Sequence, residues 1–319
     1  MIKRGEEIYC VKREKPLSWP ALWATIIWGF SFIATKIALR ELSPFTLTAV
    51  RFGIGGILLL LVQVQRNREF FKVFSGKDWL HVFLLAVVGV TGHTLLQSYG
   101  LLYTTAVDTG WIIAVYPIFI AIGGRLFLGE IITRRKVAGI ALGFLGVFFI
   151  ISKGNYSFSL LQSASTFGDL LILGSAFTWT AFTVGGRGFL SKYSSLSAMT
   201  PIMIVGFLIT LPFSGGIEGW TVLFHLSLSA WASVLFLGVF CSGLAFLFWY
   251  SALEKVESSM IGVYLYMEPF VTLIAAFLFL DESVEWITLF GGGLTLLGVY
   301  LTTWTFAKKT EKGCLDCRD

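Results

Sequence analysis

The sequence has few charged residues: Asp, Glu, Lys and Arg make up 13% of its 319 positions. Soluble domains carry about 25%, so this chain could not cover a water-facing surface with polar groups. The sequence also lacks a phosphate-binding loop, an HExxH pair and a nucleophile elbow, which argues against ATP-driven machinery and the common hydrolases. It has no cluster of metal ligands, so we expect no metal and no cofactor.

Cysteine is also scarce, with Cys10, Cys241, Cys314 and Cys317 in the whole chain. The CxxC in the polar tail has no second pair of ligands nearby, and a zinc site needs about four. We therefore expect free thiols. The net charge of +5 does not predict a nucleic-acid partner, because the basic residues lie in loops between apolar segments.

Apolar residues, in contrast, make up 56% of the chain and include 30 Phe and 11 Trp. They gather in stretches close to the roughly 20 residues that a helix needs to cross a bilayer. The expected spans are 20–40, 45–64, 80–102, 106–128, 136–152, 168–190, 197–213, 230–252, 259–280 and 286–306. The sequence thus predicts an all-α integral membrane protein with ten transmembrane helices.

The basic residues divide unequally between the two sides of these spans. The N-terminal side carries 18 Lys and Arg residues, and the opposite side carries Arg40 and Lys153 alone. Loops rich in Lys and Arg stay in the cytoplasm, so both termini are expected there, as an even number of spans requires. We expect a plasma membrane location, such as a bacterial inner membrane. The basic residues before residue 19 precede no cleavage signature and indicate a cytoplasmic flank rather than a signal peptide.

The chain also contains an internal repeat. Residues 101–147 and 253–299 share 13 identical positions of 47 without a gap, including Pro117 with Pro269 and Gly146 with Gly298. A similar shift matches Trp28 with Trp179. Each copy holds five spans, and an odd number inverts the second copy in the membrane. Inverted repeats recur in secondary transporters, with the solute site near the midplane between the halves. Duplication in a membrane protein that does not transport is the alternative.

Several short motifs occur in a regular order along the two copies of the repeat. They are Trp28-Gly29 with Phe32, Pro44 followed by Arg51-Phe52, Pro117, Leu128-Gly129-Glu130, Glu268-Pro269, Leu280-Asp281-Glu282 and the Gly-rich fifth and tenth spans. With them the chain resembles the EamA branch of the drug/metabolite transporter superfamily over residues 20–306. Each motif alone is weak, but their order across two copies is fairly specific.

The resemblance implies two inverted five-helix halves around a central cavity, at 20–152 and 168–306, between cytoplasmic tails at 1–19 and 307–319. It implies a secondary transporter that moves small metabolites, such as amino acids or related compounds, without ATP hydrolysis. We expect an exporter working by alternating access, and not an enzyme. A channel-like facilitator and a polytopic membrane enzyme are the alternatives. The expected partners are a small-molecule substrate and the lipid bilayer, in a monomer or homodimer.

Ionisable and polar residues within spans are the candidate site residues, because they are costly in lipid. Glu268 lies mid-span before Pro269, and is expected to bind a substrate ammonium or to couple transport to protons; a structural carboxylate is the alternative. His93 and Gln97 share one helix face, with Tyr99 close by. They are expected to contact the solute, although a lone His can also bond a neighbouring backbone group.

Aromatic residues supply the rest of the expected cavity, since Tyr and Trp combine an apolar face with a polar tip. The candidates are Trp28, Trp179, Tyr116 and Tyr264; lipid-facing belts use the same residue types. Near the outer span ends, Lys36 is a candidate for a substrate carboxylate, with snorkelling as the equal alternative. For Arg51 snorkelling is favoured.

Two further predictions concern contacts between spans. We expect Asp108 to pair with Lys36 or Arg51, and the acidic residues that end the fourth and ninth spans to pair with loop cations such as Arg134. Gly139, Gly143, Gly146, Gly291, Gly292, Gly293 and Gly298 form small-residue faces on the fifth and tenth spans. Such faces permit close helix packing, and packing within one protomer is the expectation.

Overall fold

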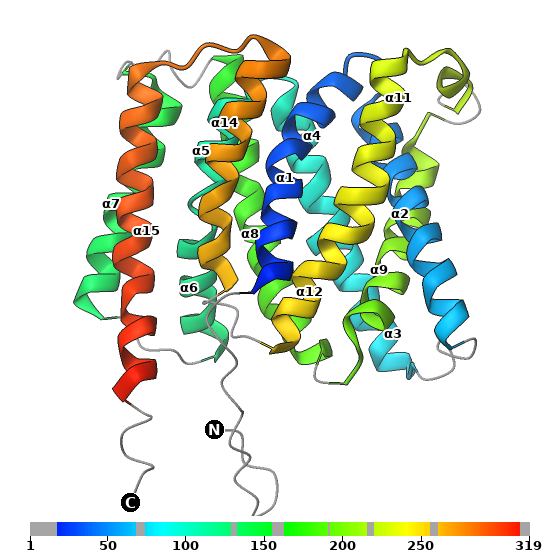
Figure 1. Cartoon of the computed structure of the whole chain (residues 1–319), viewed down its shortest axis with the longest axis horizontal. Helices are drawn as coiled ribbons and strands as arrows, with labels where there is room; N and C mark the ends of the chain where they lie inside the picture. Colours follow the sequence, from blue (N-terminus) through cyan, green and yellow to red (C-terminus); the bar gives the residue numbers. More distant parts are fainter. Residues whose placement is uncertain are drawn as a thin grey trace, which may run out of the picture.

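The computed structural model describes residues 18–67, 74–128, 133–154, 163–190, 192–215, 220–255 and 261–312. All the regular elements in these ranges are helical. The long helices stand side by side and run between two ends of the molecule, which we name upper and lower as in Figure 1. Helix α1 begins and α15 ends at the lower end (Figure 1).

The first half of the chain supplies the helices up to residue 152. They are α1 (Trp19–Ala38), α2 (Pro44–Arg66), α3 (Gly76–Leu84), η2 (Leu85–Gly92), α4 (His93–Leu101), α5 (Ala106–Ile113), α6 (Tyr116–Leu128) and α7 (Arg134–Ser152). The side chains of Ser18, Ser43, Ser75, Thr105 and Thr133 accept bonds from backbone N–H groups in the first turns. They satisfy donors that a helix start leaves without partners.

The second half supplies the remaining helices. They are α8 (Ala164–Leu190), α9 (Ser195–Thr210), η4 (Leu211–Phe213), η5 (Val222–His225), α11 (Leu228–Leu235), η6 (Phe236–Ala245), α12 (Phe246–Lys255), η7 (Gly262–Tyr266), α14 (Met267–Leu280) and α15 (Trp286–Lys312). Ser194 and Ser227 cap α9 and α11 in the same way as the serines of the first half.

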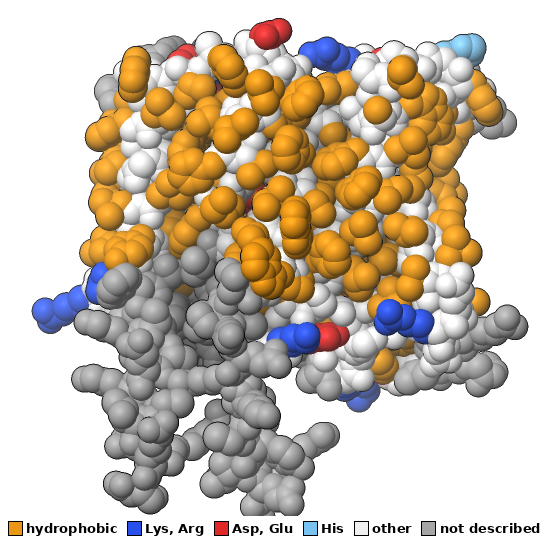
Figure 2. Space-filling view, in the orientation of Figure 1, with side chains coloured by type: hydrophobic (Ala, Val, Ile, Leu, Met, Phe, Trp, Pro, Cys, Tyr) orange, Lys and Arg blue, Asp and Glu red, His pale blue; other side chains and the backbone are white. Residues whose placement is uncertain are grey.

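Eight of the described helices, counted through their internal breaks, are long and apolar enough to cross a membrane. Their bounds agree with the first eight predicted spans to within about one helical turn. Two shorter apolar helices, Tyr264–Leu280 and Trp286–Leu301, lie where the ninth and tenth spans are predicted. Figure 2 shows hydrophobic side chains over most of the visible face, with charged groups gathered toward its two ends.

The fourth and ninth predicted spans are interrupted rather than continuous. Helix α5 ends at Ile113 and α6 begins at Tyr116, and the 3-10 helix η7 leads into α14 at Met267. The cause is a proline one turn further along in each case. Pro117 and Pro269 have no N–H to donate to the carbonyls of Ile113 and Leu265, four residues earlier. Both breaks lie mid-way through an apolar segment.

Two π-helical turns occur at matching places in the halves. The segment η2 joins α3 to α4, and η6 joins α11 to α12. Glycine permits close contact there: a Cβ on Gly89 would lie 2.4 Å from Phe182, and one on Gly238 would lie 2.6 Å from Ile54. Single π turns inside α-helices often mark functional sites. His93 and Phe246 follow these two segments directly.

The small-residue faces of α7 and α15 pack against each other. A Cβ on Gly146 would lie 2.4 Å from the carbonyl oxygen of Gly291, and one on Gly298 would lie 2.4 Å from the Gly143 nitrogen. The hydroxyl of Thr295 on α15 donates to the Gly143 carbonyl of α7 at 3.5 Å. The prediction of packing within one protomer is therefore confirmed for Gly146, Gly291 and Gly298, whereas a Cβ on Gly293 would meet nothing within 4 Å.

Candidate functional site

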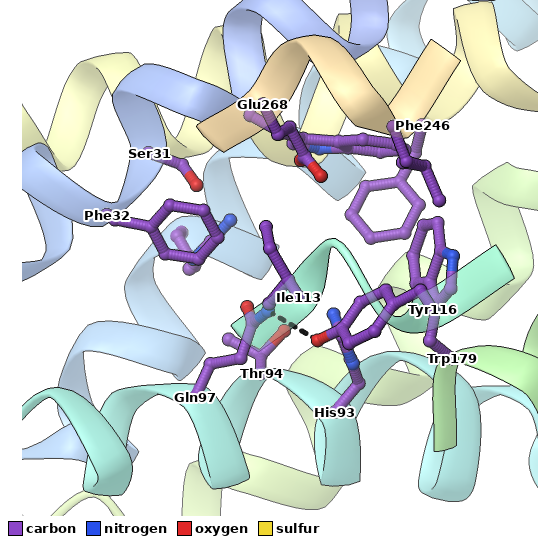
Figure 3. Close-up of a pocket in the computed structure, with 13 residues that line it drawn as sticks. Ser31, Phe32, His93, Thr94, Gln97, Ile113, Tyr116, Trp179, Phe246 and Glu268 are labelled. Atoms are coloured by element: carbon purple, nitrogen blue, oxygen red, sulfur yellow. Dashed lines mark hydrogen bonds between the residues drawn. The ribbon is translucent and has the colours of Figure 1, made fainter. Parts of the chain in front are cut away.

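A small cavity lies in the middle of the molecule, where helices from both halves meet (Figure 3). It is lined by Trp28, Ser31, Phe32, Arg51, His93, Thr94, Gln97, Ile113, Tyr116, Trp179, Phe246, Leu265 and Glu268. About 30 Å³ is open inside it, room for roughly two water molecules. Both halves of the chain thus contribute to one mixed polar and aromatic site.

One wall of the cavity is aromatic. The rings of Trp28 and Trp179 meet edge to face with centroids 5.1 Å apart, and Phe246 lies 5.3 Å from Trp28. Trp249, fully buried behind them, lies 5.4 Å from Trp28. The indole N–H of Trp28 donates to the Cys241 carbonyl at 3.4 Å. These contacts hold the two equivalent tryptophans of the repeat in fixed orientations.

A chain of hydrogen bonds that meets at Ser175 lies next to this aromatic wall, since the His93 and Tyr116 rings lie 5.0 and 6.3 Å from the Trp179 ring. The Ser175 hydroxyl donates to the Ile172 carbonyl at 2.6 Å and accepts from the Tyr116 hydroxyl at 2.5 Å. The Gln97 amide then donates to Tyr116 at 3.1 Å (Figure 3). His93 Nδ1 lies 3.2 Å from the Ser175 carbonyl. Since a carbonyl only accepts, Nδ1 carries a proton, which leaves Nε2 as the acceptor of the neutral ring.

Two side chains of opposite charge complete the cavity. Glu268 is 4% exposed and sits in the first turn of α14, where the helix dipole favours a negative group. Its carboxylate receives no hydrogen bond from the part of the chain that the structure describes, and Figure 3 shows it pointing into the open space. Arg51 is 7% exposed and donates from Nε to Ser242 at 3.0 Å. The prediction that Arg51 snorkels to the interface is wrong, because it lies inside.

The helix breaks shape this site. Ile113 and Leu265, the residues four positions before the two prolines, both line the cavity. Tyr116 and Glu268 each precede one of those prolines and occupy equivalent positions in the repeat. The interruptions therefore lie beside the cavity, and each half contributes one polar side chain next to its break, Tyr116 and Glu268.

Most of the predicted site residues come together here. Trp28, His93, Gln97, Tyr116, Trp179 and Glu268 line the cavity. Three other candidates lie elsewhere. Tyr99 contacts the ring of Phe45 at 6.2 Å, and the Tyr264 hydroxyl accepts from the Ser18 N–H at 2.5 Å. The Lys36 ammonium lies 2.7 Å from Glu282 at the upper end of the molecule.

The sequence reasoning did not select several residues that line the cavity: Ser31, Thr94, Ile113, Phe246 and Leu265. For two of them a signal was present. Ile113 and Leu265 lie four residues before Pro117 and Pro269, the position whose carbonyl a helical proline leaves free. For Phe246, one of many phenylalanines, composition offers no such signal.

The predicted ion pairs between spans have other partners. Asp108 pairs with Lys153 at 3.0 Å, not with Lys36 or Arg51. Glu282 pairs with Lys36 and not with Arg134. Glu130, Cys10, Cys314 and Cys317 lie outside the described residues. Within the described ranges no three His, Cys, Asp or Glu residues are grouped as metal ligands.

Comparison with known proteins matches nearly the whole chain. A profile of the EamA-like transporter family matches residues 19–152 and again 166–304. An uncharacterized transporter of Archaeoglobus fulgidus is 37% identical over 278 residues, which covers 87% of this chain and 94% of that protein. The uncharacterized transporter YyaM of Bacillus subtilis is 26% identical, with 86% and 89% covered. A crystal structure at 20% identity shares the fold, with a TM-score of 0.65 over 90% of this chain and 98% of its own.

Proposed function

Because the chain belongs to the EamA-like transporter family, we propose that this multi-pass membrane transporter carries small zwitterionic metabolites such as amino acids. One observation carries the proposal: a buried anionic and a buried cationic side chain face the same aromatic cavity. A substrate ammonium pairs with Glu268 and a substrate carboxylate with Arg51. The rings of Trp28 and Trp179 receive an apolar side chain between these two ends.

Arginine suits this role because its planar guanidinium binds a carboxylate through two parallel hydrogen bonds. Its Nε is committed to Ser242, so the remaining N–H groups are those offered to the substrate. Neutral polar contacts come from His93 and the Gln97–Tyr116 pair. A site that buries polar groups rejects analogues that leave those groups unpaired.

The mechanism proposed is alternating access by ten spans in two inverted halves. It is supported by the internal repeat, by the matching π-helical segments η2 and η6, and by the paired breaks before α6 and α14. Ligand sites typically occupy roughly 300–1,000 Å³, whereas this cavity leaves about 30 Å³. In the cycle, substrate therefore enters only after the halves move apart.

We place the protein in the plasma membrane with both termini in the cytoplasm, as the distribution of Lys and Arg favours, and assign it export. Glu268 is the group that couples transport to protons, since it is the acidic side chain within the cavity lining. A channel-like facilitator remains the alternative, and the kinetics of flux distinguish the two.

The test uses the purified full chain in proteoliposomes, with uptake of a labelled aromatic amino acid in competition with analogues. The decarboxylated amine and the deaminated acid should each compete roughly tenfold to hundredfold less well, because each loses a charged hydrogen bond of about 1.5–3 kcal/mol. Equal competition by all three would refute zwitterion recognition. Flux that rises without saturation would point to a facilitator.

A further inference from the structure

A second group of polar side chains, some buried and some half-buried, lies at the upper end of the molecule, away from the central cavity. It consists of Lys36, Thr104, Asp108, Lys153, Asp169 and Glu282, which we name the upper polar cluster. None of these residues lines the cavity. They join α1, the turn between α4 and α5, the end of α7, the start of α8 and the residues after α14.

Asp169, on α8, is the unusual member of the upper polar cluster. It is 0% exposed. Its Oδ1 accepts from the Thr104 hydroxyl, while Oδ2 is buried and has no hydrogen-bond partner within the described residues. Burying an ionised carboxylate with an unpaired oxygen costs far more than burying a neutral acid, in which the charge is absent.

The charges around Asp169 do not balance it. Lys153 lies 3.0 Å from Asp108, whose other oxygen accepts from Thr288 at 3.1 Å. Burial lowers the pKa of Lys153, and the carboxylates of Asp108, Asp169 and Glu285 raise it. Together the carboxylates outweigh burial, so the net shift of this pKa is upward. One ammonium therefore faces two buried carboxylates. Lys36, the other cation of the cluster, is paired with Glu282.

Among the residues that the structure describes, the other neighbours of α8 supply no second cation at this level. Helix α4 offers His93, in contact with Ser175 near the cavity, and the hydroxyl of Tyr99, and Tyr103 follows in the turn after it. Helices α6 and α12 meet α8 lower down, at Thr180 and Gly186. One proton on Asp169 would restore neutrality to the buried group.

Thr104 connects Asp169 to the rest of the cluster. Its hydroxyl reaches Asp169, and its carbonyl accepts from the Lys36 ammonium at 2.9 Å. The same ammonium lies 2.7 Å from Glu282, whose two oxygens accept from the N–H groups of Ala106 and Val107, each at 3.1 Å.

The turn between α4 and α5 also packs closely against α8. A Cβ on Gly168 would lie 2.7 Å from the Gly100 carbonyl oxygen and 3.0 Å from the Thr104 nitrogen. This turn is thus held between α8 on one side and α1 with Glu282 on the other. Separation of α8 from the turn must break the contact between Asp169 and Thr104 and expose Asp169 to water.

We propose that Asp169 is a proton-binding site that keeps the upper end of the transporter closed. With its proton bound, the upper polar cluster is neutral and the turn stays against α8. Once the turn separates, water solvates the carboxylate and the proton is released. The closed arrangement is therefore favoured at low pH and lost as the pH rises, by at most about tenfold per pH unit for one proton.

The test follows hydrogen exchange at the amides of Ala106 and Val107 in the full chain in nanodiscs. Wild type is compared with Asp169→Asn at each pH, so that intrinsic exchange rates cancel. Asn keeps an acceptor for Thr104 and cannot ionise. Below about pH 4, the ordinary pKa of an exposed Asp carboxyl, the two should agree. Above that pH the wild type should exchange faster, by up to about tenfold for each pH unit, until Asp169 also ionises in the closed arrangement. Glu285→Gln, an exposed carboxylate near the cluster, should respond as wild type does.

An identical pH response in wild type and Asp169→Asn would overturn the proposal. Protection that follows the sodium concentration at constant pH would also overturn it, in favour of a cation site. If Asp169→Asn does not fold, infrared difference spectra of the wild type test the proposal instead. A protonated-carboxyl band should disappear on alkalinisation, and Glu268→Gln should retain it. Loss of the band in Glu268→Gln would refute Asp169 as its source. Neither readout needs a substrate, so both are independent of the proposed amino-acid specificity.

Discussion

The replacement of Arg51 by lysine tests most directly how the cavity recognises its substrate. The guanidinium is 7% exposed and donates from Nε to Ser242 at 3.0 Å, so it is already oriented toward the cavity. A carboxylate bound there would take two parallel hydrogen bonds. Lysine keeps the charge, but it offers a point contact in place of the planar pair.

We therefore expect Arg51→Lys to remove one charged hydrogen bond, about 1.5–3 kcal/mol. Since each 1.4 kcal/mol is tenfold in affinity, amino acids should bind roughly tenfold to 150-fold more weakly. The decarboxylated amine has no carboxylate to lose and should bind as before. Solvent screening is weak at a buried site, so the loss should persist at high salt.

Competition for uptake in proteoliposomes measures both affinities in the same preparation. Arg40→Lys is the matched control, because Arg40 is exposed in the loop after α1 and should change neither affinity. If Arg51→Lys weakens the amino acid and the amine equally, the reasoning is refuted. Arg51 would then serve to hold α2 against η6 through Ser242.

Four further predictions follow from the same contacts. Glu268→Gln should abolish gradient-driven accumulation while leaving exchange intact, with exposed Glu285→Gln as control; unchanged accumulation in a flux assay would contradict proton coupling there. His93→Ala should change affinity or selectivity in the same competition assay, because Nε2 is lost as an acceptor; if every substrate is untouched, His93 is structural. Gly146→Ala should lower the thermal midpoint of unfolding, since its Cβ would lie 2.4 Å from the Gly291 carbonyl. Gly293→Ala is the control, because its Cβ would meet nothing within 4 Å and the midpoint should not change. Equal effects of the two variants would refute the close packing. Hydrogen bonds from the Ser227 hydroxyl and N–H lower the pKa of Glu41. The Ser227 amide should therefore stay protected, relative to its intrinsic exchange rate at each pH, at neutral pH and lose protection only as the pH falls through that lowered value; protection that does not change with pH would refute the contact.

The central cavity was largely predictable because its members are unusual where they stand. Glu268, His93 and Gln97 are polar groups in the middle of apolar segments, where lipid makes them costly. Trp28 and Trp179 occupy matching places in the repeat, which separates them from the other tryptophans. The sequence did not show whether Lys and Arg residues near the span ends point inward or outward. Side chains that snorkel to the interface and side chains that contact other helices are of the same types and lie at the same depth.

The sequence by itself determined the spans, the uneven distribution of Lys and Arg, and the repeat. These are properties of consecutive residues: in lipid a helix satisfies its own backbone hydrogen bonds, so a long apolar run is enough to predict one. The tertiary structure decided that Arg51 turns inward, that Lys36 pairs with Glu282, and that Asp169 is buried with one oxygen unpaired. Those outcomes depend on how each helix is rotated and what it packs against, and partners far apart in the chain fix both.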